Sequence, residues 1–574
     1  MYKRPFTAAL VAALCLAAPA AAAATPPDRI LSGATVITVN TAQPQAEAIA
    51  IRDGKIVAVG SDADVLALAG PETSVERLDG KTVLPGFIDA HGHLSMQARI
   101  SFMRNLAPAP VGTVRNIADL QREMRVQVGH PATKLSGWAI GFGYDDSLLA
   151  EERHPTREEL DAVSRETPVV VLHASLHLAS ANSKALEMAG ITAETPNPPG
   201  GVIRRQDGSQ EPDGVLEETA MHMLFGALPQ PTIEQGLLTL GAAQQTYAKH
   251  GITTAQEGAA DKATVAMLQE AARRGALNID VVAYPTWMDA DEILTSTAPG
   301  GYDGRLKIGG VKLVLDGSPQ GKTAWLSHPY HVPPEGLAAD YRGYPMIQPD
   351  EVRSRIADYA KKGWPVIAHA NGDAASELLI DSVAAVGDER KDKDHRTVMI
   401  HAQTVRPDQL DRMAQLGMIP SFFVAHTFFW GDWHRESVLG EERAERISPA
   451  KSAGKKGIRY TFHNDSPVVP PDMMRLIWTG VNRKTRSGEV LGWQERVTPQ
   501  EAIEAVTISA ARQNFEEDQK GSIEIGKRAD LVVLADNPLT VAPEAIADIA
   551  VVETIKDGRT IFPAVTAPPA ARAR

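Results

Sequence analysis

The sequence predicts an α/β protein built on a parallel (β/α)8 barrel, with a small β-domain assembled from both ends of the chain. Two observations lead to this prediction. The middle of the 574-residue chain alternates short apolar segments with helical stretches, a pattern typical of a parallel sheet or barrel. Both ends are rich in strand-like segments and Asp-Gly turns, which favours one shared β-domain over two unrelated β appendages.

Nine segments in the middle region are candidate strands, one more than an eight-stranded barrel needs. The segment 168–173 lies within a long stretch, about 95–235, that lacks regular strand–helix spacing. We interpret this stretch as an insertion after the first barrel strand. The remaining strands are expected at 84–90, 252–256, 280–284, 309–315, 365–369, 397–401, 418–423 and 459–463.

The two ends of the chain supply the strands of the expected β-domain. Asp53-Gly54 and Asp557-Gly558 are hairpin signals, since such pairs favour tight turns between strands. The strand-like segments are 30–39, 48–60, 529–534 and 549–552. The domain boundaries that we expect are 25–82 for the first part of a β-sandwich, 83–515 for the barrel with its insertion, and 516–574 for the second part of the sandwich and a C-terminal tail.

Residues 1–24 have the pattern of a cleavable secretory signal peptide. Lys3 and Arg4 precede an apolar stretch, and alanines suited to cleavage lead to Ala24. The apolar stretch is shorter than the ~20 residues of a membrane span, so a membrane anchor is the less favoured alternative. We therefore expect a periplasmic or secreted protein with no membrane contact after the signal is removed.

Charge and cysteine content limit the chemistry. The net charge is -13, and about -15 without the signal segment, which argues against nucleic acid as a partner. The single cysteine, Cys15, lies in the signal segment. The mature chain then has neither disulfides nor thiolate chemistry, so any metal must be held by histidine, carboxylate or a modified lysine.

A His-x-His pair follows the first predicted barrel strand. An apolar run and a Pro-Gly turn lead into His91 and His93. Alternate residues of a strand share a face, so both imidazoles can point at one metal, and imidazole is the commonest metal ligand among side chains. The alternative, a chance pair of surface histidines, does not account for the matching residues downstream.

Those downstream residues fall in or at the ends of other predicted barrel strands, where barrels place their active sites. Lys312 lies in the strand 309–315. His369, His401 and Asp465 come at or just after the ends of the strands 365–369, 397–401 and 459–463.

These residues and several further motifs resemble the metal-dependent amidohydrolase superfamily, and within it the branch of YtcJ-like proteins and N-substituted formamide deformylases. The resemblance runs from about Ile30 to Phe562. It implies a distorted (β/α)8 TIM barrel with a composite β-sandwich domain, hydrolysis at a one- or two-metal centre, and an insertion that covers the active site. The motifs are PGFIDAHGH (85–93), NSKALEMAGI (182–191), GITTAQEG (251–258), VKLVLDGS (311–318), HANGD (369–373) and GSIEIGKRADLVVL (521–534).

The resemblance implies how these residues share the metals. His91 and His93 would hold one ion, most simply Zn2+, and His369 and His401 a second. Lys312, carboxylated by CO2, would bridge the two; the alternative is a Lys312 that only pairs with a carboxylate and leaves one metal.

Asp465 would contact the metal and act as general base, taking a proton from the attacking water and passing it to the leaving nitrogen.

Further residues are candidates for substrate contact, each with a structural alternative. His177 matches a histidine of the branch and is a candidate catalytic residue that contacts substrate or an oxyanion. Asp89 is a candidate partner for a ligand imidazole. At 463–464 this chain has His-Asn where the branch commonly has Gly-Ser. The tentative substrate-binding residues are Trp138, Asp145, Asp316, His426, Trp430 and His463.

The expected function is that of an exported metal-dependent hydrolase acting on a non-peptide C–N bond of an N-acyl or N-formyl small molecule. Hydrolysis of an ester or carbamate, or deamination, uses the same kind of centre. The His-x-x-Glu pattern that favours deamination is absent at His369, where Gly372 is the third residue onward. A non-catalytic binding protein is the alternative from another class, and a homo-oligomer is compatible with the sequence.

Overall fold

The computed structural model describes residues 25–228, 232–295, 300–334, 336–387 and 394–563. The expected signal peptide and the tail beyond 563 lie outside the described residues. Within them, no helix has both the length and the apolar character needed to cross a membrane.

Two parallel sheets form the centre of the molecule. Their strand orders are β17-β16-β15-β8 and β18-β19-β20-β21-β22. A bridge between Thr286 and Lys312 continues the pairing from the end of β16 to β18. The strands are β8 (Phe87–Ile88), β15 (Ile252–Ala260), β16 (Asp280–Pro285), β17 (Leu306–Ile308), β18 (Val311–Val314), β19 (Val366–Ala370), β20 (Val398–His401), β21 (Ile419–Phe422) and β22 (Thr461–Phe462).

Two backbone hydrogen bonds join the chain just after β8 to the chain just after β22. The Asp465 N–H donates to the His91 carbonyl at 3.0 Å, and the His93 N–H donates to the Ser466 carbonyl at 2.7 Å. The first and last strands of the series therefore end side by side. Because neighbouring strands are parallel, their carboxyl ends gather at one edge, as in a TIM barrel.

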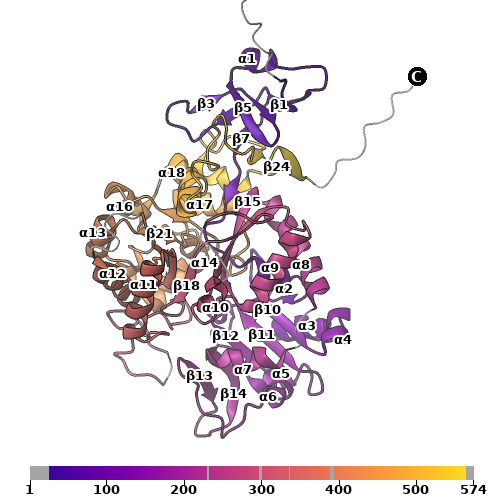
Figure 1. The fold of residues 1–574 in the computed structure, drawn as a ribbon. Helices are drawn as coiled ribbons and strands as arrows, with labels where there is room; N and C mark the ends of the chain where they lie inside the picture. The colour runs from indigo at the N-terminus through magenta and orange to yellow at the C-terminus, as the bar shows by residue number, and fades with distance from the viewer. Residues whose placement is uncertain (1–24, 229–231, 296–299, 335, 388–393, 564–574) are drawn as a thin grey trace, which may run out of the picture.

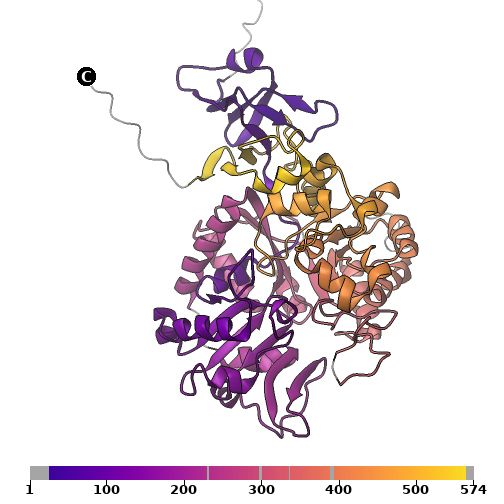
Figure 2. The ribbon, with the colours of Figure 1, turned by 180° about the vertical axis from the view of Figure 1, so that it is seen from behind.

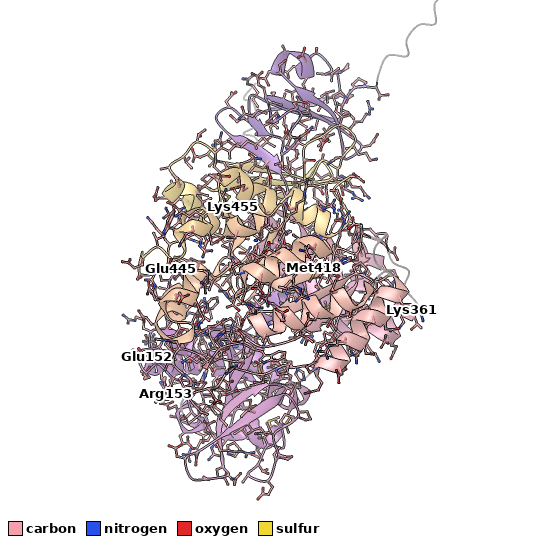
Figure 3. The ribbon with its side chains drawn as sticks, turned by 90° about the vertical axis from the view of Figure 1, so that its left-hand side faces the viewer. Glu152, Arg153, Lys361, Met418, Glu445 and Lys455 are labelled. Atoms are coloured by element: carbon pink, nitrogen blue, oxygen red, sulfur yellow. The ribbon has the colours of Figure 1, made fainter. Side chains whose placement is uncertain are left out.

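Helices cover the outer side of these strands (Figure 3), where Met418 lies near the middle of the helical face and Lys361 at its edge. Helices α8 and α9 pack on β15, and α12 packs on β19. The helices are α8 (Ile233–Lys249), α9 (Lys262–Arg273), α11 (Pro349–Lys362), α12 (Asp373–Ala385) and α13 (Pro407–Leu416).

Helix α11 illustrates why these segments are helical. Pro349 occupies the first turn, where its missing N–H costs nothing. Val352, Ile356 and Tyr359 recur at helical spacing and are buried. Gly363 ends the helix in a left-handed conformation with φ 77°, which a glycine adopts without strain.

Two glycines change the bounds of predicted strands: one divides a segment in two, and the other delays the start of a strand. The expected strand 84–90 is split at Gly86 into β7 (Thr82–Pro85) and β8, which belong to different sheets. A Cβ on Gly86 would lie 2.4 Å from a side-chain carbon of Thr253. The expected strand 309–315 begins two residues late because Gly310 has φ 154°, and a Cβ there would lie 2.2 Å from the Pro365 carbonyl oxygen.

One six-stranded sheet combines both ends of the chain, in the order β25-β24-β23-β7-β2-β3. Strand β7 pairs antiparallel with β23, with Thr82 opposite Leu534. A second sheet, β5-β4-β1-β6, lies beyond it at the top of Figure 1. The strands are β1 (Arg29–Ser32), β2 (Thr35–Ile37), β3 (Gln45–Ala46), β4 (Ala48–Arg52), β5 (Lys55–Gly60), β6 (Ser74–Arg77), β23 (Leu531–Leu534), β24 (Val551–Lys556) and β25 (Arg559–Phe562).

Both predicted hairpin turns of these sheets are confirmed. Asp53 and Gly54 have φ of 51° and 74° between β4 and β5, and Asp557 and Gly558 have φ of 47° and 74° between β24 and β25. Positive φ at both central residues is the conformation that tight hairpins require.

The stretch that we interpret as an insertion contains a sheet of its own, in the order β13-β14-β12-β11-β10-β9. It lies at the end of the molecule opposite the terminal sheets (Figures 1 and 2). Its β11 is the predicted strand 168–173, and it pairs with β10 and β12 rather than with the central sheets. The strands are β9 (Arg104–Asn105), β10 (Ala139–Tyr144), β11 (Val169–His173), β12 (Leu178–Ala181), β13 (Gly201–Arg205) and β14 (Pro212–Glu218).

A buried charge cluster ties the C-terminal segment to the central strands. Asp280 at the start of β16 accepts hydrogen bonds from Lys520 at 2.6 Å and Lys556 at 2.7 Å. Lys556 also donates to Asp530 at 2.7 Å. Burial alone would raise the pKa of Asp280, but the two lysines hold it below its usual value.

We predict that Asp280→Ala lowers the free energy of unfolding by about 3–5 kcal/mol, because it leaves buried lysines without their shared carboxylate. Thermal and urea unfolding measure the loss. The depressed pKa means that the contribution of Asp280 is present above about pH 4 and lost as the pH falls further. Asp350→Ala, at a fully exposed aspartate of α11, is the control; an equal loss in both variants would contradict the prediction.

Candidate metal centre

His91, His93 and Asp465 come together at the carboxyl-end edge of the central strands. Asp465 Oδ1 lies 3.2 Å from His93 Nε2 and 3.5 Å from His91 Nε2. These three residues offer ligand atoms that all lie within 4.8 Å of one another. The two backbone hydrogen bonds between the strand ends hold this arrangement, because they fix the main chain on either side of the three side chains.

Lys312 reaches the same point from β18. Its Nζ lies 2.9 Å from His91 Nε2, and the residue is 1% exposed. Burial lowers the pKa of Lys312 to about 8. This amine therefore loses its proton at a lower pH than an ordinary lysine does, and the uncharged form is the one that reacts with CO2.

His369 at the end of β19 and His401 at the end of β20 lie directly beside each other. His369 Nδ1 is 3.1 Å from His401 Nε2. His369 Nε2 lies 3.1 Å from the Gly317 carbonyl, which favours a proton on Nε2, and 3.0 Å from the Asn371 side-chain nitrogen, which favours a lone pair there. His369 Nδ1 faces His401 Nε2, which itself lies 4.0 Å from Asp465 Oδ2.

Gln256 of β15 orients His91, and the sequence analysis did not select it. Its amide N–H donates to the Ala90 carbonyl at 2.7 Å, so its oxygen faces His91 Nδ1 at 2.6 Å. This contact places the proton of His91 on Nδ1 and leaves Nε2 free for a metal. Asp89, the expected partner of a ligand imidazole, instead accepts the Asn464 N–H at 3.2 Å.

His463 contacts the candidate ligand His401, much as Gln256 contacts His91. Its Nε2 lies 3.2 Å from His401 Nδ1, and its Nδ1 lies 2.8 Å from Ser421 Oγ. The residue is fully buried, and burial lowers its pKa to about 3. These contacts place His463 against a candidate ligand, and its expected contact with substrate stays a prediction.

The main chain is strained at two of the candidate ligands. His401 has φ 74° and Asp465 has φ 55°, a left-handed region that costs a non-glycine residue about 1–3 kcal/mol. Strain of this kind persists where the surrounding structure dictates the conformation, and it is concentrated at functional sites.

His177 lies at the rim of the centre, on the turn between β11 and β12. Its ring centroid is 5.3 Å from that of His369. Glu218 at the end of β14, which the sequence analysis missed, lies 2.7 Å from His177 Nδ1. Burial opposes protonation of His177, but Glu218 outweighs burial and raises its pKa. Glu218 therefore favours the protonated ring, in which Nε2 also carries a hydrogen-bond donor, close to His369.

Asp316, just after β18, has a carboxylate engaged by the main chain. It accepts the N–H groups of Trp325 at 2.9 Å, Asn371 at 3.0 Å and Gly372 at 2.8 Å. The residue is fully buried, and burial raises its pKa to about 7 against the effect of these bonds. The contacts favour the turn-stabilising alternative, in which Asp316 holds the loop after His369.

Three of the remaining tentative substrate residues lie together beside the insertion. The Trp430 indole N–H donates to Asp145, and the His426 ring lies 5.1 Å from the Trp430 ring. His426 and Trp430 belong to α14 (His426–Trp433). Trp138 is buried in the apolar core of the insertion.

The donor set fits a divalent metal ion. Burial and the nearby Lys312 keep the pKa of His91 well below its usual value, and burial does the same for His369 and His401. Burial disfavours ionised Asp465, but contacts with the imidazoles outweigh it and lower the pKa of the carboxylate. Asp465 Oδ1 is buried without a hydrogen-bond partner among the described residues. Neutral imidazoles and an unpartnered carboxylate are the ligands that zinc and similar ions take.

A TIM-barrel-like α/β fold with such a donor set at its strand ends defines a metal-dependent hydrolase. The comparisons with known proteins give the family: the amidohydrolase family model matches residues 75–562, and the chain belongs to this family. It is 28% identical to an N-substituted formamide deformylase of Arthrobacter pascens, over 92% of this chain and 97% of the relative. It is 26% identical to the putative amidohydrolase YtcJ of Bacillus subtilis, over 93% and 99%.

A solved structure agrees with this assignment. The chain superposes on an uncharacterized metal-dependent hydrolase from Pyrococcus horikoshii with a TM-score of 0.72 and 26% identity, covering 90% of this chain and 99% of the other. The family and the deformylase relative support a hydrolase that acts on C–N bonds.

We predict that Gln256→Leu weakens metal binding by about 10- to 100-fold, because His91 loses the contact that fixes its tautomer and orientation. Competition for Zn2+ against a chelator of known affinity measures the change. Thermal unfolding of the metal-free protein serves as the control for folding. Unchanged affinity would show that Gln256 does not act on His91.

Proposed function

We propose that this protein is an exported amidohydrolase that cleaves the C–N bond of an N-acyl or N-formyl small molecule. The observation that carries the proposal is the convergence of His91, His93, Lys312 and Asp465 at one edge of the central strands, with the first and last of them held by backbone hydrogen bonds. The likeness to a formamide deformylase supports an amide-type substrate.

The residues that would hold metal fall into two sets. His91, His93 and Asp465 would hold one ion, and His369 with His401 would hold a second. When bound, a divalent ion such as Zn2+ would polarise the scissile carbonyl and lower the pKa of a water molecule.

Lys312 lies beside His91, on the strand next to the one that carries His369, and would bridge the two sets as a carbamate. The neutral amine attacks CO2, a C–N bond forms, and one proton leaves the nitrogen. The carbamate offers two oxygen atoms as metal ligands, whereas the amine offers one nitrogen. The lowered pKa of Lys312 favours this reaction because it supplies the neutral amine.

Two side chains have the positions for proton transfer and oxyanion binding. Asp465 would accept a proton from the attacking water and deliver it to the nitrogen as the C–N bond breaks. His177, held by Glu218 through Nδ1, would in its protonated form donate a hydrogen bond from Nε2 to the carbonyl oxygen as negative charge develops there.

The finer architecture and the location of the protein belong to the same proposal. We infer a distorted eight-stranded barrel, a composite β-sandwich from both ends, and an insertion that covers the centre. The signal pattern of residues 1–24 supports action in the periplasm or outside the cell.

The first test is the metal content of the mature protein, measured together with hydrolysis of N-formyl amines, N-acyl amino acids and aryl esters. We expect about two metals per chain and turnover of amides. Turnover of esters alone would replace the amide proposal, and absence of both metal and turnover would favour a binding protein.

We predict that Asp465→Asn retains most of the bound metal and lowers kcat by at least ~10^2-fold, because the amide cannot accept the proton. Metal analysis and steady-state kinetics on the same sample check both parts. A rate close to that of the wild type would remove Asp465 from proton transfer.

We predict that Lys312→Met reduces the metal content from two ions to about one per chain and lowers activity, because the bridging group is lost. Mass spectrometry of the intact wild-type protein, with and without bicarbonate, should show a mass increase of about 44 Da for the carbamate. Full metal content and full activity in Lys312→Met would contradict the bridging role.

A further inference from the structure

A cavity of about 240 Å³ is lined by Pro467, which follows Asp465 by two positions in the sequence, and by residues of the insertion. Pro467 forms part of its wall, as does Gln97, whose side-chain oxygen accepts a hydrogen bond from Ser466 at 3.0 Å. Most of the lining is apolar, but Arg486 faces the same space. A small apolar pocket with few polar groups is the usual form of a site for a small molecule.

Arg486 has an unused hydrogen-bonding capacity. Its Nε is buried and has no hydrogen-bond partner among the described residues, and none of them forms an ion pair with its guanidinium. The guanidinium carbon lies 5.1 Å from the centre of the Phe429 ring. A guanidinium stacked on an aromatic face keeps its N–H edge available for a planar anion.

The two acidic residues whose charges act on Arg486 are hydrogen-bonded to other groups. Asp145 accepts hydrogen bonds from the Trp430 indole and from a neighbouring serine. Asp432 accepts the N–H of Ser487 at 3.1 Å and its hydroxyl at 2.7 Å. Neither acid forms a direct pair with Arg486, so the cation is not neutralised by contact within the protein.

The other basic residues that line the cavity do not offer a free positive charge to an anion. Arg104 also lines the cavity, but its Nε donates to Glu123 at 2.8 Å. Burial lowers the pKa of His250, which favours the neutral form of this lining histidine. Among the described lining residues, Arg486 is therefore the cation without a direct ion-pair partner, although Asp145, which also lines the cavity, lies close enough to act on its charge.

The loop that carries Arg486 is ordered by its own contacts. The Thr485 N–H donates to the Glu489 carbonyl at 2.8 Å, and Gly488 takes φ 92° to close the turn. With Phe429 beneath the guanidinium, the side chain loses little conformational freedom when it binds an anion.

We propose that Arg486 binds a carboxylate of the substrate, and that the enzyme acts on N-acyl or N-formyl amino acids with apolar side chains in preference to neutral amides. This inference rests on the proposed amidohydrolase function and specifies its substrate class. Two parallel N–H groups of a guanidinium match the two oxygens of a carboxylate. The apolar wall, which includes Ile100, Met103 and Phe142, suits an apolar side chain.

The test compares N-formyl-leucine with N-formyl-isopentylamine, which lacks the carboxylate but is otherwise alike. The wild type should prefer N-formyl-leucine. Arg486→Met should lower kcat/KM for this substrate by about 10- to 100-fold, mainly through KM, as expected for loss of a charge-assisted bidentate contact. The value for N-formyl-isopentylamine should change by less than about twofold, and Arg486→Lys should fall between.

Lys484→Met is the matched control, because it removes one positive charge near the same turn from a residue that does not line the cavity. It should leave the preference intact. Equal loss on both substrates in Arg486→Met, or no preference in the wild type, would overturn the carboxylate assignment while leaving amide hydrolysis in place.

If the metal-loaded wild type hydrolyses neither compound, the proposed function fails for this class, and the role of Arg486 is then decided by binding. Calorimetry with N-formyl-leucine should show at least about tenfold weaker binding to Arg486→Met than to the wild type. Equal binding, or none to the wild type, would overturn the inference.

Discussion

The structure depends on two backbone hydrogen bonds that join the chain after β8 to the chain after β22. They bring residues far apart in sequence to one edge of the central strands, and they set His91, His93 and Asp465 within reach of one another. The left-handed backbone of Asp465 follows from the same constraint, since its N–H must meet the His91 carbonyl while its carboxylate turns toward the imidazoles.

Crowding several imidazoles in a buried space creates a need for fixed proton positions. Each ring has two nitrogens, and a metal needs the lone pair of a defined one. The protein meets this need with neutral neighbours: Gln256 faces His91, the Gly317 carbonyl faces His369, and His463 faces His401. Carboxylates approach the same rings from further away: Asp316 Oδ1 lies 3.5 Å from His369 Nε2, and Glu257 Oε1 lies 4.0 Å from His93 Nδ1.

The sequence predicted the TIM-barrel-like α/β fold and the residues at the strand ends, because both follow from local signals: apolar runs, turn dipeptides and polar residues at fixed positions. It could not separate β7 from β8, because Gly86 and Thr253 meet only in the folded chain. The sequence does not single out Gln256, Glu218 or Arg486, for a related reason. Each is an ordinary polar residue locally, and each is distinguished by a tertiary neighbour or by the lack of one.

The pairing of β7 with β23 limits when, during synthesis of the chain, the protein can complete its fold. Thr82 lies opposite Leu534, yet roughly 450 residues of chain lie between them. A ribosome adding about 5–20 residues per second needs roughly 20–90 s to cover that distance. Throughout this interval β7, which leads directly into the strand before His91, can pair with β2 but lacks β23 on its other side. Such distant pairing forms late, so the nascent polypeptide becomes an enzyme only when translation has almost finished.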